Sequence, residues 1–246
     1  MKTLGTTPPG TATEEQAARW VRSMFGRVAH RYDLLNHLLS FQIDRYWRFR
    51  TVREVRHVLR RPGIRVMDLC CGTGDLLLAL SEHKKSEIFG ADFCHPMLIA
   101  AAEKARKRRS SAVLFEADAL CLPVSDRSLD LVTVAFGFRN FANYRKGLEE
   151  LKRVLRPGGM VAILEFSRPQ NSLIASAYNF YSRWILPRLG GAISGSPDAY
   201  AYLPESVRKF PGAEDLAAEM RQAGYVRVRF KRMTFGVVAL HLAEVD

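Results

Sequence analysis

The stretch "VMDLCCGTGDLLLAL", residues 66–80, decides how the chain folds. The apolar residues of a strand end in Asp68 and a Gly-x-Gly turn, and an apolar helical pattern begins at Asp75. A strand, a glycine turn and a helix in this order are typical of the first unit of a doubly wound sheet. Such a turn could cradle a pyrophosphate, hold a metal through Cys70 and Cys71, or lie against a nucleoside without phosphate.

Strand and helix patterns alternate after this turn, which predicts an α/β fold with a parallel sheet. Strands are expected at residues 64–70, 86–93, 112–118, 129–136 and 160–166, with helices at 75–83, 96–108 and 144–155. After a helix at 212–224, period-two alternation over 225–233 and 235–245 predicts a closing antiparallel pair. We therefore expect a Rossmann-like, doubly wound, mostly parallel seven-stranded sheet with a reversed last strand.

The domain organisation follows from changes of pattern and composition along the chain. We expect a disordered leader at residues 1–15, because this segment is small and polar, and one domain over 16–246. Within that domain we expect N-terminal helices at 16–61 (broken around 32–44), a cofactor-binding core at 62–167, an apolar substrate cap at 168–211, and a C-terminal helix and strand pair at 212–246.

The formal net charge of +12 is concentrated in "RYWRFRTVREVRHVLRR", residues 45–61, which holds seven arginines and one glutamate. Phe49, Val52, Val55 and Leu59 recur there at helical spacing, which predicts an amphipathic helix. Its basic face could meet anionic lipid or nucleic acid, or it could simply be a solvated surface over a core-packing face.

Features that are missing from the sequence limit the expected cellular location of the protein and its expected metal sites. It has no apolar signal core and no run of about eighteen apolar residues, so we expect a cytoplasmic protein, with peripheral contact at the inner face of the membrane left open. Its four cysteines include no C-x-x-C pair, so we expect reduced thiols that pack as small hydrophobes, and no metal site.

The residues around the turn favour a nucleoside that carries a positive charge. Position 77 is Leu where a dinucleotide turn has its third glycine, and no Gly-Lys-Ser/Thr follows, so a phosphate anchor is missing.

Acids at the ends of three successive predicted strands meet at one edge of a parallel sheet, where ligands of open α/β folds bind. Asp68 is suited to a cationic group, Asp92 to the ribose hydroxyls, and Asp118 with the Ala119 backbone to the adenine amino group. Gly72-Thr73-Gly74 lets the backbone approach the ligand closely. S-adenosylmethionine fits this description.

At this point a family resemblance becomes specific. "VMDLCCGTGD", "GADF" and "FEADAL" resemble the first three motifs of class I S-adenosylmethionine-dependent methyltransferases. "MFGRVAHRYDLLNHLLSFQIDRYWR", "RVLRPGGMVAILEFSRP", "YLPESVRKFP" and "TFGVVALH" are similar to landmarks of the demethylmenaquinone methyltransferase and ubiquinone C-methyltransferase family, over roughly residues 20–245. The resemblance implies an enzyme that C-methylates demethylmenaquinol to menaquinol. The alternative is 2-methoxy-6-polyprenyl-1,4-benzoquinol of the ubiquinone series, or both quinols.

Under this reading "FGFRN", residues 136–140, supplies the chemistry. Arg139 would stabilise the phenolate that makes a ring carbon nucleophilic, and Asn140 would orient that oxygen. Alternatively, Arg139 only forms a salt bridge with a surface acid. The general base stays unassigned; the candidates are His30, Tyr32, Asp33, His37 and His241.

Three positions depart from the residues common in the family: Leu35 for Met, Asp44 for His and Ala135 for Ser. We therefore assign Asp44 no catalytic role, and we expect the backbone at Ala135 to contact the methionine part of the cofactor.

Partners follow from the remaining features. The aromatic segment 178–193 could line a channel for a polyprenyl tail, or it could only cap the sheet. A nucleic-acid methyltransferase is the distant alternative, but no tetrapeptide for a flipped amino group and no RNA-binding module appears, so we expect no nucleic-acid partner. A non-enzymatic membrane scaffold and a homodimer are left open.

Overall fold

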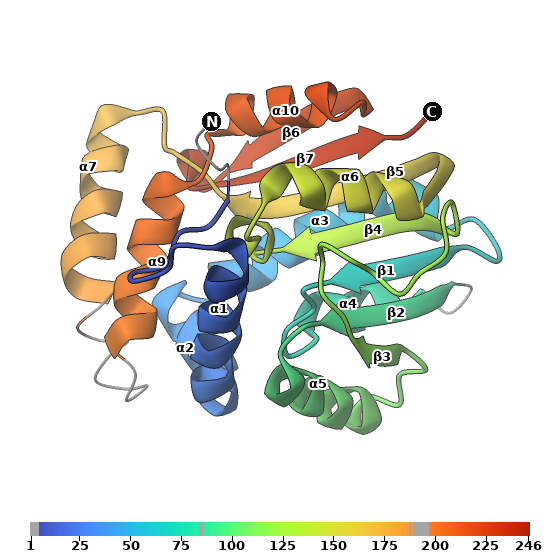
Figure 1. The fold of residues 1–246 in the computed structure, drawn as a ribbon, viewed down its shortest axis with the longest axis horizontal. Coiled ribbons are helices and arrows are strands. Elements are labelled where there is room, and N and C mark those ends of the chain that lie inside the picture. Colours follow the sequence, from blue (N-terminus) through green and yellow to red (C-terminus); the bar gives the residue numbers. More distant parts are fainter. Residues whose placement is uncertain (1–4, 84–85, 187, 189–196) are drawn as a thin grey trace.

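The computed structural model describes residues 5–83, 86–186, 188 and 197–246, and its centre is a seven-stranded sheet (Figure 1). The strands are β1 (Arg65–Leu69), β2 (Glu87–Asp92), β3 (Val113–Glu116), β4 (Leu129–Ala135), β5 (Leu155–Phe166), β6 (Val226–Met233) and β7 (Val238–Glu244). Their order across the sheet is β3-β2-β1-β4-β5-β7-β6, with β1 to β5 parallel and β7 antiparallel to both its neighbours. The predicted doubly wound sheet with a reversed last strand is confirmed.

Helices cover both faces of the sheet and its carboxyl edge. They are α1 (Glu14–Val28), η1 (Ala29–Arg31), α2 (Tyr32–Leu39), α3 (Ile43–Leu59), α4 (Asp75–Ser81), α5 (His95–Lys107), η2 (Phe138–Asn140), α6 (Tyr144–Val154), α7 (Ser172–Phe180), η3 (Tyr181–Ile185), α9 (Pro197–Lys209), α10 (Ala213–Gln222) and η4 (Thr234–Gly236). Apolar residues of α6 and α10 pack on one face of the sheet, and those of α3, α4 and α5 pack on the other. Among the described residues, no helix is both long and apolar enough to cross a bilayer.

The carboxyl edge is covered by elements from distant parts of the chain. α1, α2, η3 and α9 share a third apolar cluster, which includes Leu35, Leu186 and Tyr202. In Figure 1 the arrowhead of β4 points toward α1 and α9, with α7 beyond them at the left of the view. The N-terminal helices and the cap segment therefore enclose the edge at which the three acids were expected.

The structure differs from the expected disordered leader at residues 5–15. The Thr6 amide donates to the carbonyl of Phe141 at 2.8 Å, and the Thr6 hydroxyl lies 2.6 Å from the Tyr202 hydroxyl. Gly5 lies so close to the backbone of Ala142 that a Cβ there would overlap its carbonyl oxygen. α1 then begins at Glu14. A polar segment is ordered here because the loop after β4 supplies its hydrogen-bond partners.

The basic helix α3 also differs in part from its predicted pattern. Val55 and Leu59 are buried as expected, but Phe49 is 61% exposed. The buried face instead continues through Thr51 and Trp47, one turn and two turns before Val55. α2 fills much of the segment that was expected to break the N-terminal helices.

Candidate active site

The glycine turn between β1 and α4 has a backbone that only glycine adopts readily. Gly72 has φ +55° and Gly74 has φ +88°, both in the left-handed region. A Cβ on Gly74 would also lie 3.2 Å from the Cβ of Ala101 on α5. The turn therefore lets α4 start directly at Asp75 and pack closely on α5.

A cavity opens beside this turn, and we call it the cofactor cavity. It brings together the predicted residues Gly72, Asp92, Asp118, Ala119 and Asn140. Its other lining residues come from the same sheet edge, the N-terminal helices and α5: Ala18, Phe25, Tyr32, Cys70, Phe93, Met97, Ala117, Leu120, Ala135, Phe136, Gly137, Phe141 and Ala142. Segments that end strands β1, β2, β3 and β4 thus meet at one cavity.

Asp92 is the most firmly held acid of the cofactor cavity. The amides of Gly72 and Cys94 each donate to its carboxylate at 2.9 Å, and the residue is 6% exposed. Burial raises the pKa of Asp92 to about 6, although these amides oppose the rise. Most Asp92 carboxyls are therefore ionised at neutral pH and can accept hydrogen bonds from a ligand. Asp118, in contrast, is exposed, and it accepts from the Leu120 amide at 2.9 Å.

Asp68 lies behind the turn and does not line the cofactor cavity. It is 1% exposed, and the hydroxyl of Thr133 on β4 donates to its Oδ1 at 2.6 Å. Its Oδ2 has no hydrogen-bond partner among the described residues, and burial raises the pKa of Asp68 to about 7. Asp68 therefore supports the turn from below, and its expected contact with a cationic group stays a prediction.

Thr73 and Gly74, two further predicted cofactor residues, also lie outside the lining of the cofactor cavity. The Thr73 hydroxyl donates to Asp33, and it accepts from the ammonium of Lys104 at 3.1 Å. Lys104 also pairs with Asp75 at 2.7 Å. Thr73 therefore fastens the turn to α2, and Asp33 is held in this ion pair network rather than placed as a free acid–base group.

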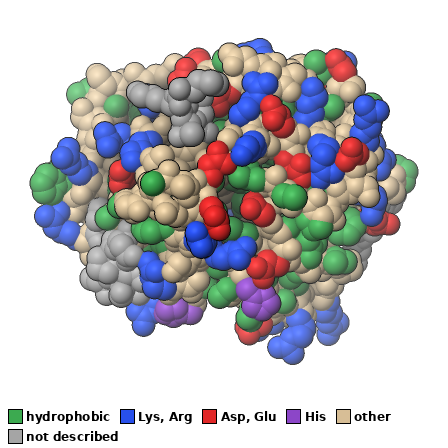
Figure 2. Space-filling model, in the orientation of Figure 1, with side chains coloured by type: hydrophobic (Ala, Val, Ile, Leu, Met, Phe, Trp, Pro, Cys, Tyr) green, Lys and Arg blue, Asp and Glu red, His purple; other side chains and the backbone are tan. Residues whose placement is uncertain are grey.

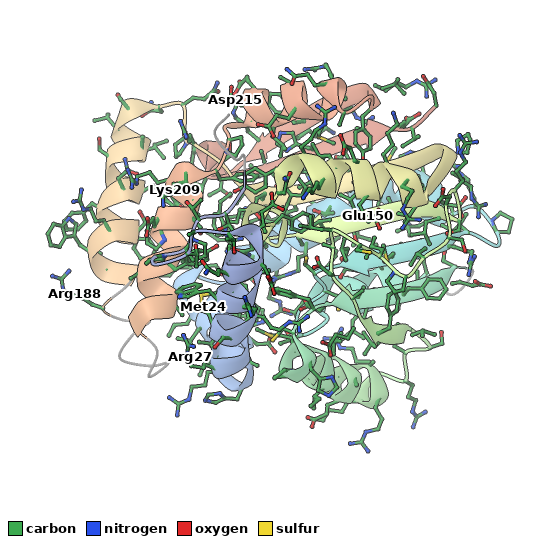
Figure 3. The ribbon with its side chains drawn as sticks, in the orientation of Figure 1. Met24, Arg27, Glu150, Arg188, Lys209 and Asp215 are labelled. Atoms are coloured by element: carbon green, nitrogen blue, oxygen red, sulfur yellow. The ribbon has the colours of Figure 1, made fainter. Side chains whose placement is uncertain are left out.

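A second, larger cavity of about 260 Å³ adjoins the first, and we call it the substrate cavity. It shares Phe25, Tyr32 and Phe136 with the cofactor cavity. Most of its remaining lining residues are apolar or aromatic: Met24, Val28, Leu39, Phe41, Ile43, Trp47, Phe166, Tyr178, Tyr181, Leu186, Ala199, Tyr202, Leu203, Pro204, Val207 and Val237, with Asn36, Ser40, Asp44, Arg48, Arg139, Ser182 and Thr234. Figure 3 shows Met24, one of these residues, between α1 and α9.

Arg139 lines the substrate cavity and is 6% exposed. Its partner is not a surface acid but the buried Glu165 of β5, whose Oε1 lies 3.0 Å from Arg139 Nη1. Nη1 also donates to the Phe136 carbonyl, and the guanidinium lies 5.3 Å from the centre of the Phe166 ring. Burial raises the pKa of Glu165 even with Arg139 beside it. The Nε atom of Arg139 is buried without a partner among the described residues.

Asn140 faces the cofactor cavity rather than the substrate cavity. Its Oδ1 accepts from the Tyr202 hydroxyl at 3.0 Å, and Tyr202 in turn lies beside Thr6. Asn140 therefore links the cofactor cavity to α9 and to the N-terminal segment. Its expected contact with a phenolate oxygen stays a prediction.

Asp44 lies in the wall of the substrate cavity, and it is 3% exposed. Its carboxylate accepts from the Ser40 hydroxyl at 2.7 Å and pairs with Arg48 and with His37 Nδ1. Although burial alone would raise it, the Ser40 hydrogen bond and the Arg48 charge hold the pKa of Asp44 below its ordinary value. An ionised Asp44 anchors Arg48, whose guanidinium lies 5.8 Å from the centre of the Phe136 ring.

Among the described residues, His37, Asp44 and Asp75 form one group whose possible metal-ligand atoms all lie within 4.8 Å of one another. Arg48 and Lys104 already pair with these two carboxylates. The group is therefore already occupied by the protein's own cations.

Two of the singled-out histidines lie apart from the two cavities. His30 is exposed, and His241 is buried beneath α10 with Nε2 2.8 Å from the Ala213 carbonyl oxygen. Burial lowers the pKa of His241 to about 4. Cys71 and Cys94 are buried as expected, but Cys70 lines the cofactor cavity and Cys121 is exposed.

Comparison of the sequence with known proteins shows which family the chain resembles. The model of the ubiE/COQ5 methyltransferase family matches residues 11–244. A demethylmenaquinone methyltransferase of Thermus thermophilus is 50% identical over 222 residues, which is 90% of this chain and 99% of the relative. A ubiquinone/menaquinone biosynthesis C-methyltransferase of Syntrophotalea carbinolica is 42% identical over 221 residues, covering 89% of this chain and 92% of the relative.

The fold is also found among solved structures. A SAM-dependent methyltransferase from Aquifex aeolicus matches with a TM-score of 0.58 and 21% identity, over 79% of this chain and 89% of that one. The chain belongs to the ubiE/COQ5 methyltransferase family.

Proposed function

We propose that the chain transfers a methyl group from S-adenosylmethionine to a ring carbon of demethylmenaquinol, giving menaquinol. The observation that carries this proposal is the pair of adjacent cavities, one with Asp92 and Asp118 in its lining and one apolar with a buried arginine. The names of the relatives support the substrate class, and they include both the menaquinone and the ubiquinone series. Methylation of 2-methoxy-6-polyprenyl-1,4-benzoquinol is therefore the second candidate.

The cofactor cavity fits a nucleoside. Asp92 would accept the ribose hydroxyls, because two backbone amides already orient its carboxylate. Asp118 and the Ala119 backbone would hold the adenine, and the cavity wall at Cys70, Ala135 and Gly137 would meet the methionine part. When bound, S-adenosylmethionine supplies an electrophilic methyl group on a sulfonium. No metal is required for this step.

Arg139 would act on the acceptor. Loss of a proton from the ring hydroxyl gives a phenolate whose charge is shared with the adjacent ring carbon, and that carbon forms the new C–C bond. A guanidinium in an apolar cavity stabilises such a charge more than it would in water. Loss of the ring proton then restores the aromatic ring. Arg139 is no base, because, although burial opposes it, the Glu165 charge raises the pKa of the guanidinium above its already high ordinary value.

Glu165 would position Arg139. Its carboxylate receives the Arg139 amide at 3.2 Å and the side-chain Nη1 at 3.0 Å, so backbone and guanidinium are fixed together. The Phe136 carbonyl holds Nη1 from the other side. A guanidinium fixed by the Glu165 carboxylate and the Phe136 carbonyl needs little rearrangement when charge develops on the substrate.

Quantification of labelled methyl transfer tests the function. Purified enzyme, methyl-labelled S-adenosylmethionine and demethylmenaquinol under reducing conditions should yield labelled menaquinol. A parallel reaction with the methoxy-benzoquinol compares the rate of methylation of the second candidate substrate with that of demethylmenaquinol. Absence of label in both quinols would contradict the proposed function. RNA binding that weakens steeply with increasing salt concentration would favour the nucleic-acid methyltransferase instead.

We also infer that the enzyme is cytoplasmic and meets its substrate at the membrane surface, because a polyprenyl tail keeps a quinol in the bilayer. The apolar lining of the substrate cavity supports this inference.

A further inference from the structure

The substrate cavity has an opening at Phe41, in the turn that follows α2. Phe41 lines the cavity and is nevertheless 72% exposed, so the cavity reaches solvent beside it. Its ring lies 5.9 Å from that of Tyr181 in η3, and the Tyr181 hydroxyl donates to the Leu39 carbonyl at 2.6 Å. The opening therefore lies where the end of α2 meets η3.

Large apolar side chains flank this opening on both elements. Leu34 and Leu38, one turn apart on α2, are 61% and 50% exposed. Phe180 and Trp184, one turn apart at the end of α7 and in η3, are 60% and 49% exposed. We call these four residues together with Phe41 the docking face. Tyr181, which lies between Phe180 and Trp184 in sequence, lines the cavity and packs against Phe41, so the exposed pair lies near the same opening.

The two segments that carry the docking face contain basic but no acidic residues. Residues 34–42 and 170–188 contain no Asp or Glu, and the second segment contributes Arg183 and Arg188. Both arginines are exposed, and the Arg188 guanidinium lies 5.2 Å from the centre of a Trp184 ring. Figure 3 shows Arg188 reaching outward at the left edge of the molecule, and Figure 2 shows hydrophobic side chains bordered by Lys and Arg at that end.

We propose that the docking face inserts into an anionic bilayer and opens the substrate cavity directly to the lipid. This inference rests on the proposed function, because it assumes a substrate held in the membrane. Exposed aromatic and leucine side chains with neighbouring arginines are the composition that binds such an interface. A protein partner that covered the same residues would close the opening at Phe41, whereas a bilayer would deliver the substrate there.

This face is not the one that net charge alone suggests. The first two turns of α3 line the substrate cavity, but Arg53 and Arg56 lie on its later turns and Arg60 follows its end. Arg56 is twelve residues beyond Asp44, which places it about 18 Å further along the helix. Val55, Val58 and Leu59 of those turns pack into the core of the sheet. The basic half of α3 is therefore a solvated face over a core helix.

Co-sedimentation with vesicles tests the docking face. The full chain is mixed with vesicles of phosphatidylglycerol and phosphatidylcholine in equal parts, and with vesicles of phosphatidylcholine alone. Replacing Leu34, Leu38 and Trp184 by Ser should lower the partition coefficient on the anionic vesicles about tenfold or more, since three apolar side chains no longer insert. Arg183→Gln with Arg188→Gln should weaken binding to the anionic vesicles and leave binding to the neutral ones nearly unchanged.

Two matched controls keep the result interpretable. Phe49→Ser, Ile99→Ser and Val113→Ser together remove three comparably exposed apolar residues elsewhere, and they should leave vesicle binding unchanged. Arg53→Gln, Arg56→Gln and Arg60→Gln together should lower anionic binding less than the docking-face variant does. Equal vesicle binding by the docking-face variant and the unmodified chain, or a larger loss in the α3 variant, would overturn the proposal.

Activity separates failure of the docking face from failure of the proposed function. With a demethylnaphthoquinol that has a short, water-soluble tail, the docking-face variant should keep normal turnover, and with a long-tailed quinol in vesicles it should lose most of it. If no quinol is methylated but the docking-face variant loses vesicle binding, the result supports the membrane-docking surface and contradicts the proposed function. Equal turnover of the vesicle-held quinol by variant and unmodified chain would overturn delivery through this face.

Discussion

The cofactor cavity and the substrate cavity share a wall but are built in different ways. The cofactor cavity is lined largely by the ends of successive strands, so its acids recur at corresponding points of a repeating pattern. The substrate cavity combines α1, α2, α3, η3, α9 and η4 with the edge of β4 and β5. Its buried Arg139 is held by Glu165, 26 residues further along the chain. The residues of the cofactor cavity can therefore be predicted from the repeating strand and helix pattern. The lining of the substrate cavity depends on tertiary packing, which the pattern does not give.

The largest expected effect separates the two cavities. Arg139→Met should lower kcat about a thousandfold, because removal of one stabilising group at a developing anion costs on the order of 10²–10³ in rate. The affinity for S-adenosylmethionine should stay within about twofold, since Arg139 does not line the cofactor cavity. Initial rates and calorimetric titration measure both quantities.

A control is needed because Arg139→Met leaves Glu165 buried without its partner. That loss alone should lower the free energy of unfolding by about 3 kcal/mol or more. Adding Glu165→Gln to Arg139→Met should restore much of the stability without restoring turnover. Recovery of turnover along with stability would show that Arg139 matters for the fold only.

The reverse separation is expected for Asp92→Asn. It should weaken S-adenosylmethionine binding about 30- to 100-fold, because a neutral amide accepts two hydroxyl hydrogen bonds less strongly than a carboxylate does. At saturating cofactor, kcat should fall less than threefold, on the same reasoning that the acid binds and does not react. A loss of kcat as large as that of Arg139→Met would contradict the assignment of cofactor binding to one cavity and of the chemical step to the other.

Glu165→Gln tests whether the acid positions Arg139. The amide keeps most of the shape but not the charge, so we expect kcat to fall about tenfold, with a smaller change in KM. Glu165→Asp should recover part of kcat because it restores the charge. If all three forms share one kcat and differ only in melting temperature, Glu165 is solely a stabilising residue.

Cofactor binding should depend on pH through Asp92, whose pKa is raised to about 6. Hydroxyl groups bind its ionised form, so affinity is full above that pH and falls as the carboxyl takes up a proton. Below pH 6 the loss approaches tenfold per pH unit for one linked proton. Titrations of the unmodified chain and of Asp92→Asn compare the slopes, and an equally steep fall in the variant would assign the titration elsewhere.

The smallest effect is expected at Asp118. Because its side chain is exposed, Asp118→Asn should weaken S-adenosylmethionine binding only about threefold, in keeping with the low value of solvated polar contacts. Competition with adenosine-modified analogues would locate the loss at the adenine. A loss larger than that of Asp92→Asn would reverse the ranking of the two acids.

The rule that residues ending parallel strands meet at one edge of the sheet explains how much of the site could be predicted from the sequence. It predicted that Asp92 and Asp118 lie at one edge of the sheet, and both line the cofactor cavity, because residues that end parallel strands arrive at the same edge. It did not predict that Asp68, Thr73 and Gly74 lie outside the lining of that cavity, since position in the chain does not fix where a side chain points. Asp68 turns toward Thr133 on β4, and Thr73 turns toward α2.

Glu165 was missed, although its signal was present. It is the one charged residue in "MVAILEF", residues 160–166, an otherwise apolar strand. An acid in a strand buried on both faces needs a charged partner. Which cation it meets depends on how the loop after β4 folds back over β5, and that is a tertiary property. The same holds for Asp44 and Arg48, which reach the substrate cavity only because α3 lies across the sheet edge.

The central claim is that methyl transfer occurs at the wall shared by the two cavities. A crystal structure with S-adenosylhomocysteine and demethylmenaquinol bound together tests it most directly. We predict the ribose on Asp92, a quinol oxygen against Arg139, and the acceptor ring carbon facing the sulfur across the boundary formed by Phe25, Tyr32 and Phe136. A quinol ring bound outside the substrate cavity, or an oxygen rather than a carbon facing the sulfur, would contradict the account.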